Sequence, residues 1–256
     1  MPHQIQENLE NIFRKIKDFL EKDPNIVFAL VFGSAATGKL RKDSDIDVAI
    51  YVKNSVSGYE LLSLMQKLSD LIKREVEIVV LNEASPLLRH QVMKNRKELF
   101  IKDFSVYSKF RENTIDDYQE YLDVTNKLKK IEQYVEELKN IKEVSFEEFQ
   151  KNIVIKRFIE RNLELAIQQM IDVCKHIVSR LNLREPNSYA DCFEILGEKR
   201  IVSEENLEKY KNMVKFRNLL IHIYDTVSDK IVYQVYKERL KDFEIFIKEI
   251  KNYFKI

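Results

Sequence analysis

An apolar run that ends at a glycine–serine turn, followed by an Asp-x-Asp sequence, constrains the fold of this chain more than any other feature. The run Ile26–Phe32 predicts a buried strand that is too short to span a membrane. Gly33 and Ser34 follow it, and Asp45 and Asp47 begin the next apolar run. Because alternate side chains of a strand share a face, the two aspartates should project together and attract a cation such as magnesium. The backbone N–H groups and the hydroxyl of the turn are suited to binding phosphates.

A simpler interpretation of each half of this pattern is available. A glycine–serine turn and an acidic edge strand are both common, and neither alone indicates a ligand. The two halves in this order, on a strand–turn–strand segment, favour a site for magnesium and a phosphate-bearing substrate.

The composition predicts a globular protein of two domains. The 256 residues are 45% hydrophobic and 33% charged, with four glycines and four prolines, so we expect many helices and few long loops. The formal net charge of +1 gives no bulk attraction to nucleic acid, so any such contact needs a local patch. No signal peptide or membrane-spanning run is recognisable, and Cys174 and Cys192 lack a metal-binding spacing. We therefore expect a cytoplasmic protein with reduced thiols and no membrane partner.

A third acidic residue lies within the next apolar strand, expected at residues 76–81. Glu77 shares a face with Val79 and Leu81, and an unpaired buried carboxylate is costly. A bound metal would offset that cost, whereas exposure of Glu77 at a strand edge would require no ligand. Glu75 lies on the same face and is the alternative third carboxylate.

Near residue 110 the alternating strands give way to helical spacing that continues to the end of the chain. We place the domain boundary inside a long helix, which gives domains 1–125 and 126–256, although no glycine or proline marks a linker. The second domain should therefore be an all-α bundle.

Three helix limits in this bundle follow from local signals. The capping box at Ser145 should open one helix that continues through Ile177, and Gly197 should end a short helix. Residues 230–254 should form a single last helix.

A second polar motif occupies the penultimate helix. On a helix, Arg217 and Tyr224 are nearly eclipsed, and Asn218 and His222 lie one turn apart on the neighbouring ridge. Arginine offers a permanently charged fork for phosphate, and histidine exchanges protons near neutral pH. Together they suit binding of an RNA phosphate and attack by the adjacent 2′-hydroxyl without a metal. A solvated polar face would explain the same spacing.

The N-terminal motif resembles the signature of the DNA polymerase β nucleotidyltransferase superfamily, and most of all its minimal nucleotidyltransferases. The resemblance implies an α+β domain with a small mixed sheet and helices, which transfers a nucleotide from a triphosphate such as ATP with two Mg²⁺ ions. Gly33 and Ser34 would then bind the nucleotide. Asp45, Asp47 and Glu77 would be the metal-binding and catalytic carboxylates. The chain departs from the family in using glutamate as the third carboxylate and in lacking an arginine in the glycine–serine loop.

The C-terminal motif, Arg-x4-His-x-Tyr with Asn218 after the arginine, resembles the HEPN ribonuclease signature of HepT-type toxins. The segment Pro186–Tyr189 and Asp225 fit that pattern as well. The resemblance implies a homodimeric ribonuclease with Arg217, Asn218 and His222 as its catalytic residues. HepT-type toxins are paired with minimal nucleotidyltransferase antitoxins that transfer AMP to the motif tyrosine, here Tyr224, and silence the nuclease. This chain departs from the usual pairing because both partners lie in one polypeptide.

The sequence thus predicts a fused toxin–antitoxin protein with ATP and RNA as its substrates. Two alternatives remain open at this stage. One is a small-molecule nucleotidyltransferase of the aminoglycoside-modifying kind, which would give Arg217 and His222 no role. The other is a HEPN module that binds nucleotide without catalysis.

Overall fold

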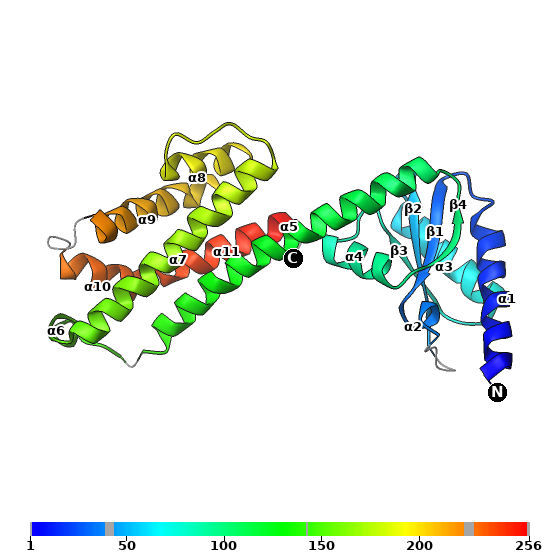
Figure 1. The fold of residues 1–256 in the computed structure, drawn as a ribbon, viewed down its shortest axis with the longest axis horizontal. Helices are drawn as coiled ribbons and strands as arrows, with labels where there is room; N and C mark the ends of the chain where they lie inside the picture. Colours follow the sequence, from blue (N-terminus) through cyan, green and yellow to red (C-terminus); the bar gives the residue numbers. More distant parts are fainter. Residues whose placement is uncertain (1, 39–43, 142, 223–227, 255–256) are drawn as a thin grey trace. The chain divides into compact units, whose positions relative to one another are not determined.

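The structure is a computed structural model that describes residues 2–38, 44–141, 143–222 and 228–254, and no side chains before Leu9 or at His222. It divides into two compact units, Met1–Tyr121 and Leu122–Ile256, which meet within one long helix (Figure 1). Each unit has a hydrophobic core of its own. In the described part of the chain, no helix combines the length and the apolar character that a bilayer crossing requires.

The first unit is built on a small mixed sheet, as the sequence predicts. Its strands have the order β3-β2-β1-β4, in which β1 is antiparallel to both β2 and β4, and β2 is parallel to β3. Its elements are α1 (Pro2–Leu20), β1 (Ile26–Phe32), α2 (Gly33–Ala36), β2 (Ile46–Val52), α3 (Gly58–Ile72), β3 (Val76–Val80), α4 (Pro86–Lys94), β4 (Lys97–Ile101) and the first part of α5 (Phe104–Lys139).

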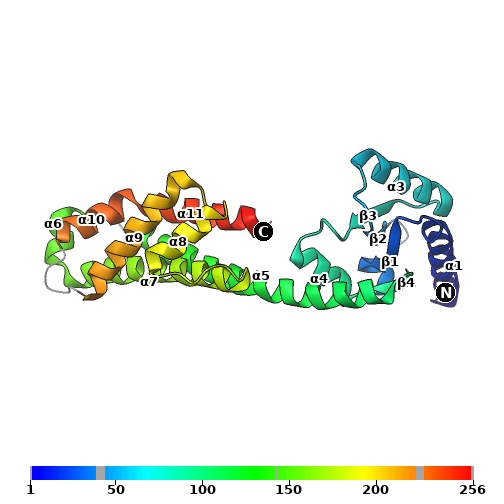
Figure 2. The same cartoon turned by 90° about the horizontal axis from the view of Figure 1, so that it is seen from above.

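Helices cover both faces of this sheet, which is why β1 is apolar almost throughout (Figure 2). Ala29 and Val31 pack with buried residues of α1 and α3 on one face. Phe28 and Leu30 pack with buried residues of α4 and α5 on the other.

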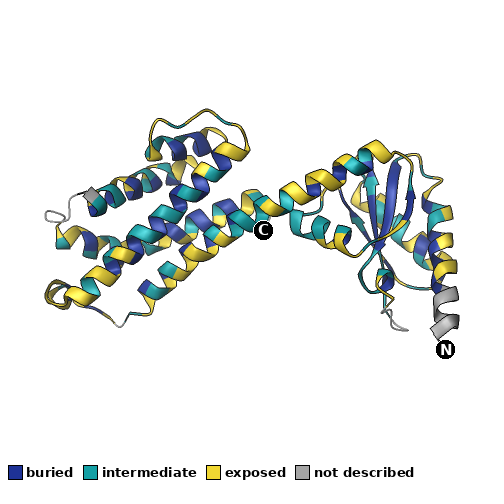
Figure 3. Ribbon diagram, viewed as in Figure 1, coloured by how far each residue is buried: buried dark blue, intermediate teal, exposed yellow. Residues whose placement is uncertain are grey.

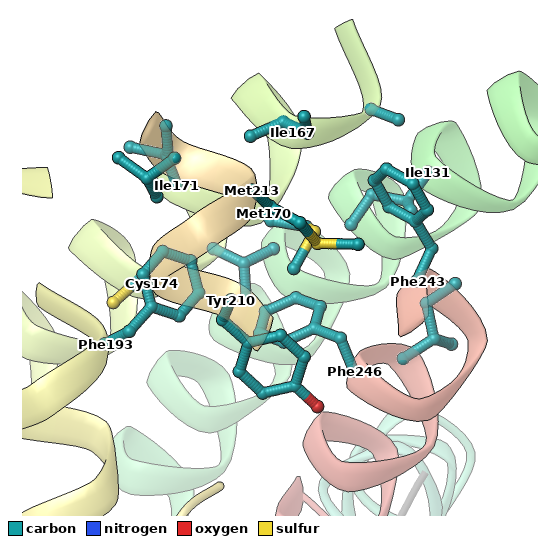
Figure 4. Packing of buried hydrophobic residues seen from close by; sticks show 14 of the residues in the cluster. Ile131, Ile167, Met170, Ile171, Cys174, Phe193, Tyr210, Met213, Phe243 and Phe246 are labelled. Carbon is teal, nitrogen blue, oxygen red and sulfur yellow. The ribbon is translucent and has the colours of Figure 1, made fainter. Parts of the chain in front are cut away.

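The second unit is an all-α bundle around one core. It comprises the rest of α5, α6 (Phe146–Lys151), α7 (Ile153–Arg180), α8 (Tyr189–Glu198), α9 (Glu204–His222), α10 (Asp229–Glu238) and α11 (Leu240–Phe254). Phe193, Tyr210 and Phe246 form a buried aromatic cluster at ring distances of 5.3 to 5.9 Å (Figure 4). Buried residues lie on the inner faces of these helices, and exposed residues lie on the outer faces (Figure 3).

The expectation of one helix from Ser145 through Ile177 is wrong. Ser145 does cap a helix, since its hydroxyl accepts a bond from the Glu148 N–H at 3.1 Å. That helix, α6, ends at Lys151, however, because Asn152 is extended and its side chain caps a new helix by accepting from the Val154 N–H.

Two further helix limits also differ from those expected. The single helix expected at residues 230–254 is interrupted at Arg239, between α10 and α11. Gly197 lies inside α8 rather than ending it, and the left-handed residue that follows this helix is Arg200. A Cβ at position 197 would make a close contact, at 3.3 Å, with the Leu207 side chain.

Candidate functional site

The glycine–serine turn and the second aspartate lie against each other at the ends of two paired strands. Phe32 of β1 is opposite Asp47 of β2, so the turn that follows Phe32 begins beside the Asp47 side chain. Gly33 has a φ of +66°, and a Cβ there would lie 2.1 Å from Asp47 Oδ2. The position therefore requires glycine for its backbone conformation and for the space that the carboxylate occupies.

Two further carboxylates lie near enough to Asp47 to affect its charge. Asp47 is in register with Glu77 of the parallel strand β3, and in-register neighbours share a face of the sheet. Burial raises the pKa of Asp47 above its ordinary value, and repulsion from Glu77 and then Asp45 raises it further. Carboxylates that destabilise one another's charge form an environment that a cation would relieve, so these residues fit Mg²⁺.

The structure also limits the expectation of a magnesium site with a buried third carboxylate. Among the described residues, no three His, Cys, Asp or Glu side chains are gathered closely enough to hold an ion in the present arrangement. Glu77 is exposed on the edge strand β3, so the argument that it is a buried carboxylate is wrong. Glu75 is exposed as well, and its carbonyl accepts a bond from the Ile46 N–H at 2.9 Å. Only Glu77 of these two glutamates is among the causes of the raised Asp47 pKa.

Ser34 lies in the single-turn helix α2, half-buried beside Gly33. Ala35, the next residue, is buried and anchors this turn to the core. The Thr37 hydroxyl and N–H both bond back to the Gly33 carbonyl, at 3.2 and 3.3 Å. The turn is therefore closed by its own hydrogen bonds and anchored to the core through Ala35.

The second unit holds Arg217 and Asn218 on the wall of a cavity of about 810 Å³, formed where α7, α8 and α9 meet. One guanidinium nitrogen of Arg217 donates to Asn218 Oδ1 at 3.3 Å, and the other donates to the side-chain oxygen of Gln168 on α7. Gln168 in turn donates to Asp172 Oδ1 at 2.9 Å. Because Asp172 accepts from the amide nitrogen of Gln168, the amide oxygen is the atom that faces Arg217.

Two residues of the C-terminal Arg-x4-His-x-Tyr motif lie at or beyond the last described residue of α9. His222 is the last residue of α9, and its side chain is outside the described part of the structure. Tyr224, the expected AMP acceptor, lies outside the described residues altogether. The structure therefore brings Arg217 and Asn218 together at one cavity and gives no geometry for the other two.

Several residues around Arg217 were missed by sequence reasoning. Lys175 lines the same cavity, Gln168 accepts a bond from the guanidinium, and Asp172 orients Gln168 by accepting from its amide nitrogen. Tyr189 also lines the cavity, and the sequence pattern includes it in the segment Pro186–Tyr189 without assigning it a role. The α7 residues have a weak signal in the sequence: positions 168, 172 and 175 follow helical spacing on one polar face. The contact of that face with α9 is a tertiary feature that no local pattern reveals.

Comparisons with known proteins divide the chain in the same way. The family model for polymerase β nucleotidyltransferases matches residues 14–105, and the model for HepT-like ribonucleases matches residues 131–250. The mRNA nuclease HepT of Shewanella oneidensis is 30% identical over 104 residues, which is 41% of this chain and 78% of that protein. The protein adenylyltransferase MntA of the same organism is 30% identical over 97 residues, which is 38% of this chain and 66% of that protein.

A solved structure is similar as well. It is that of tri-AMPylated Shewanella oneidensis HEPN toxin in complex with MNT antitoxin. One of its chains is 26% identical with a TM-score of 0.47, and the match covers 50% of this chain and 96% of that chain.

Proposed function

Because this chain belongs to the polymerase β nucleotidyltransferases in its N-terminal half and to the HepT-like ribonucleases in its C-terminal half, as a fused antitoxin and toxin, we propose that the first half silences the second. The N-terminal unit transfers AMP from ATP to Tyr224, and the modified C-terminal unit no longer cuts RNA. One observation carries the transferase half of the proposal: the Asp47 carboxylate lies against Gly33, with Glu77 and Asp45 close enough to raise its pKa.

In the transfer step, the Tyr224 oxygen attacks the α-phosphorus of ATP. The bond from that phosphorus to the bridging oxygen breaks, pyrophosphate leaves, and the phenolic proton passes to a carboxylate of the acidic cluster. Asp45, Asp47 and Glu77 would hold Mg²⁺, which stabilises negative charge on the reacting phosphates. Gly33 and Ser34 bind the triphosphate through backbone N–H groups and a hydroxyl.

In the RNA-cleavage step, Arg217 binds the scissile phosphate and His222 moves the protons. The 2′-hydroxyl attacks the adjacent phosphorus and gives its proton to His222. The bond from that phosphorus to the 5′-oxygen of the next nucleotide breaks, and the protonated His222 returns the proton to this leaving oxygen. The products are a 2′,3′-cyclic phosphate and a 5′-hydroxyl. Gln168 and Asn218 support this role because they hold the Arg217 guanidinium at the cavity wall.

The inhibition of RNA cleavage by AMP follows from the charge that the AMP group adds. Tyr224 is two residues beyond His222 in the sequence, and an attached AMP adds a phosphodiester there. That phosphodiester competes with RNA phosphate for the same cation and fills space that the RNA needs. The relatives named HepT nuclease and MntA adenylyltransferase support the pairing of these two activities.

Intact mass spectrometry after incubation with ATP and Mg²⁺ tests the transfer. We expect AMP adducts on the parent protein and none on Asp47→Ala or Tyr224→Phe. Equal modification of the parent and Asp47→Ala would contradict the transfer. AMP found on an added aminoglycoside instead of the protein would identify a small-molecule transferase, and bound ATP without pyrophosphate release would identify a non-catalytic module.

RNA degradation tests the second half separately. We expect Asp47→Ala protein, which stays unmodified, to degrade RNA, and Asp47→Ala/His222→Ala to be inactive. Equal degradation by these two variants would remove the ribonuclease from the proposal. Self-association through the HepT-like unit is part of the proposal, and light scattering should give twice the mass of one chain.

A further inference from the structure

An aromatic side chain stands at the cavity that holds Arg217. Tyr189 is the first residue of α8, directly after Ser188, whose hydroxyl caps the helix by accepting from the Asp191 N–H at 3.1 Å. The Tyr189 side chain lines the cavity and is 40% exposed, although it is large and apolar. Tyr189 therefore offers an accessible ring to whatever occupies this cavity.

Two cations lie close to that ring. Lys175 Nζ lies 5.4 Å from the ring centroid and Arg217 Cζ lies 5.8 Å from it. Lys175 is exposed on α7, so its flexible side chain is free to move aside or to follow a ligand. An aromatic side chain in a positively charged groove is the arrangement by which proteins bind single-stranded nucleic acid, with bases on the ring and phosphates on the charges.

The segment that presents Tyr189 is held in place before any ligand binds. Asp191 accepts two bonds from the Arg184 guanidinium, at 2.7 and 2.8 Å, and one from the Asn187 N–H at 2.7 Å. Arg184 also donates to Glu198 at the far end of α8, at 3.0 Å. The ring is thus positioned in advance, which lowers the cost of binding.

We propose that this cavity is a nucleobase subsite, in which one base of single-stranded RNA stacks on Tyr189 while its neighbouring phosphates bind Lys175 and Arg217. The inference rests on the proposed ribonuclease function and adds to it a residue that binds the base rather than the scissile phosphate. Glu185 and Asn187 line the same cavity and offer an acceptor and an amide to the edge of the base. A volume of about 810 Å³ is within the range of ligand pockets.

A binding experiment with an RNA that resists cleavage tests the subsite. The probe is a short single-stranded 2′-O-methyl RNA that contains 2-aminopurine, whose fluorescence falls on stacking. The protein is the full chain with Asp47→Ala, checked by intact mass to carry no AMP. In this background, Tyr189→Phe keeps the ring, Tyr189→Leu removes it, and Lys175→Gln removes one charge.

We expect Tyr189→Leu to weaken binding roughly 5- to 150-fold and to abolish the fluorescence quenching. Tyr189→Phe should bind within about twofold of its background, because stacking needs only the ring. Lys175→Gln should retain quenching but reduce the dependence of log K on log salt by about 0.7. Replacing the bases of the probe with abasic units should weaken its binding to the background protein, which retains Tyr189. The same replacement should leave binding to the Tyr189→Leu protein unchanged.

Two results would overturn the subsite, and they differ in what they imply. If the background protein binds the probe in a salt-dependent way but Tyr189→Leu matches it in affinity and quenching, the base does not stack on Tyr189, and the ribonuclease proposal stands. If the background protein binds neither this probe nor unmodified RNA, both proposals fall. The abasic probe gives an independent answer even if a substitution at Tyr189 disturbs the fold.

Discussion

Gly33 is the residue at which backbone conformation and site geometry impose the same requirement. Its φ is +66°, and a Cβ at this position would lie 2.1 Å from Asp47 Oδ2. We predict that Gly33→Ala lowers the rate of AMP transfer by about 100-fold or more, because the carboxylate must move away from the phosphate-binding turn. Mass spectrometry of AMP incorporation over time measures this rate.

Gly38 provides the matched control for this prediction. Its φ is +72°, so alanine there meets the same backbone strain, but no atom of the described residues lies within 4 Å of the position of its Cβ. Gly38→Ala should therefore affect thermal stability as Gly33→Ala does and leave transfer nearly unchanged. An equal loss of transfer in both variants would show that strain, and not displacement of Asp47, is the cause.

At the same scale, the sequence could predict that Asp47 lies near other carboxylates but not that Glu77 is exposed. Asp47 lies in β2, whereas Asp45 immediately precedes this strand, so strand geometry alone places only Asp47 on a face of the sheet. The exposure of Glu77 depends on β3 being an edge strand, which is set by the order of the whole sheet. The contact of Gln168 with Arg217 joins residues 49 positions apart and is a product of helix packing.

At the scale of elements, the N-terminus of α8 is held by an ion pair with a clear pH signature. The Arg184 guanidinium, together with the Asn187 N–H, lowers the pKa of Asp191 from 3.8 to about 2. A lowered folded-state pKa means that the stabilisation is present above pH 3.8 and is lost as the pH falls through about 2. We predict that Arg184→Gln raises the Asp191 pKa toward 3.8, as measured by carboxyl NMR titration.

The other partner of Arg184 gives the control. Glu198→Gln removes a second acceptor from the guanidinium but leaves the Arg184–Asp191 pair intact. The Asp191 pKa should then stay near 2. An Asp191 pKa that Arg184→Gln does not raise would contradict the ion pair as the main cause.

The break between α6 and α7 shows what local signals can and cannot predict about elements. Ser145 was recognisable as a cap because serine precedes a clear helical pattern. Asn152 lies inside a pattern that continues on both sides, so its cap was hidden, and at Arg239 no glycine or proline marks the break between α10 and α11. The sheet and the bundle were predictable because their apolar spacing extends over many residues, whereas a single cap depends on one side chain.

Asn152 should therefore carry a measurable part of the stability of the bundle. Its side-chain oxygen accepts from the Val154 and Ile155 N–H groups at 3.1 and 3.2 Å. We predict that Asn152→Ala destabilises the second unit by about 1 kcal/mol, as measured by urea unfolding. Asn152→Asp retains an acceptor at a helix N-terminus and should be close to neutral. A neutral Asn152→Ala would mean that water replaces the cap.

For the whole molecule, the division of the buried residues predicts two separate unfolding events. Phe246 is fully buried in the core of the second unit, and Phe28 is fully buried in the core of the first, beside Tyr51 and Tyr107. Truncating a buried phenylalanine to alanine costs about 3–5 kcal/mol. We therefore expect calorimetry to resolve two transitions, with Phe246→Ala lowering one and Phe28→Ala the other.

The functional counterpart of this prediction separates the two activities by temperature. At temperatures between the two transitions of the Phe246→Ala protein, the first unit is still folded and should bind ATP. RNA cleavage should be lost, because the contacts that hold Arg217 belong to the bundle, which is then unfolded. Phe28→Ala should show the reverse, with AMP transfer lost first. If either substitution moved both transitions by equal amounts, the units would unfold as one, and the fusion would be a single cooperative structure rather than two domains that share a helix.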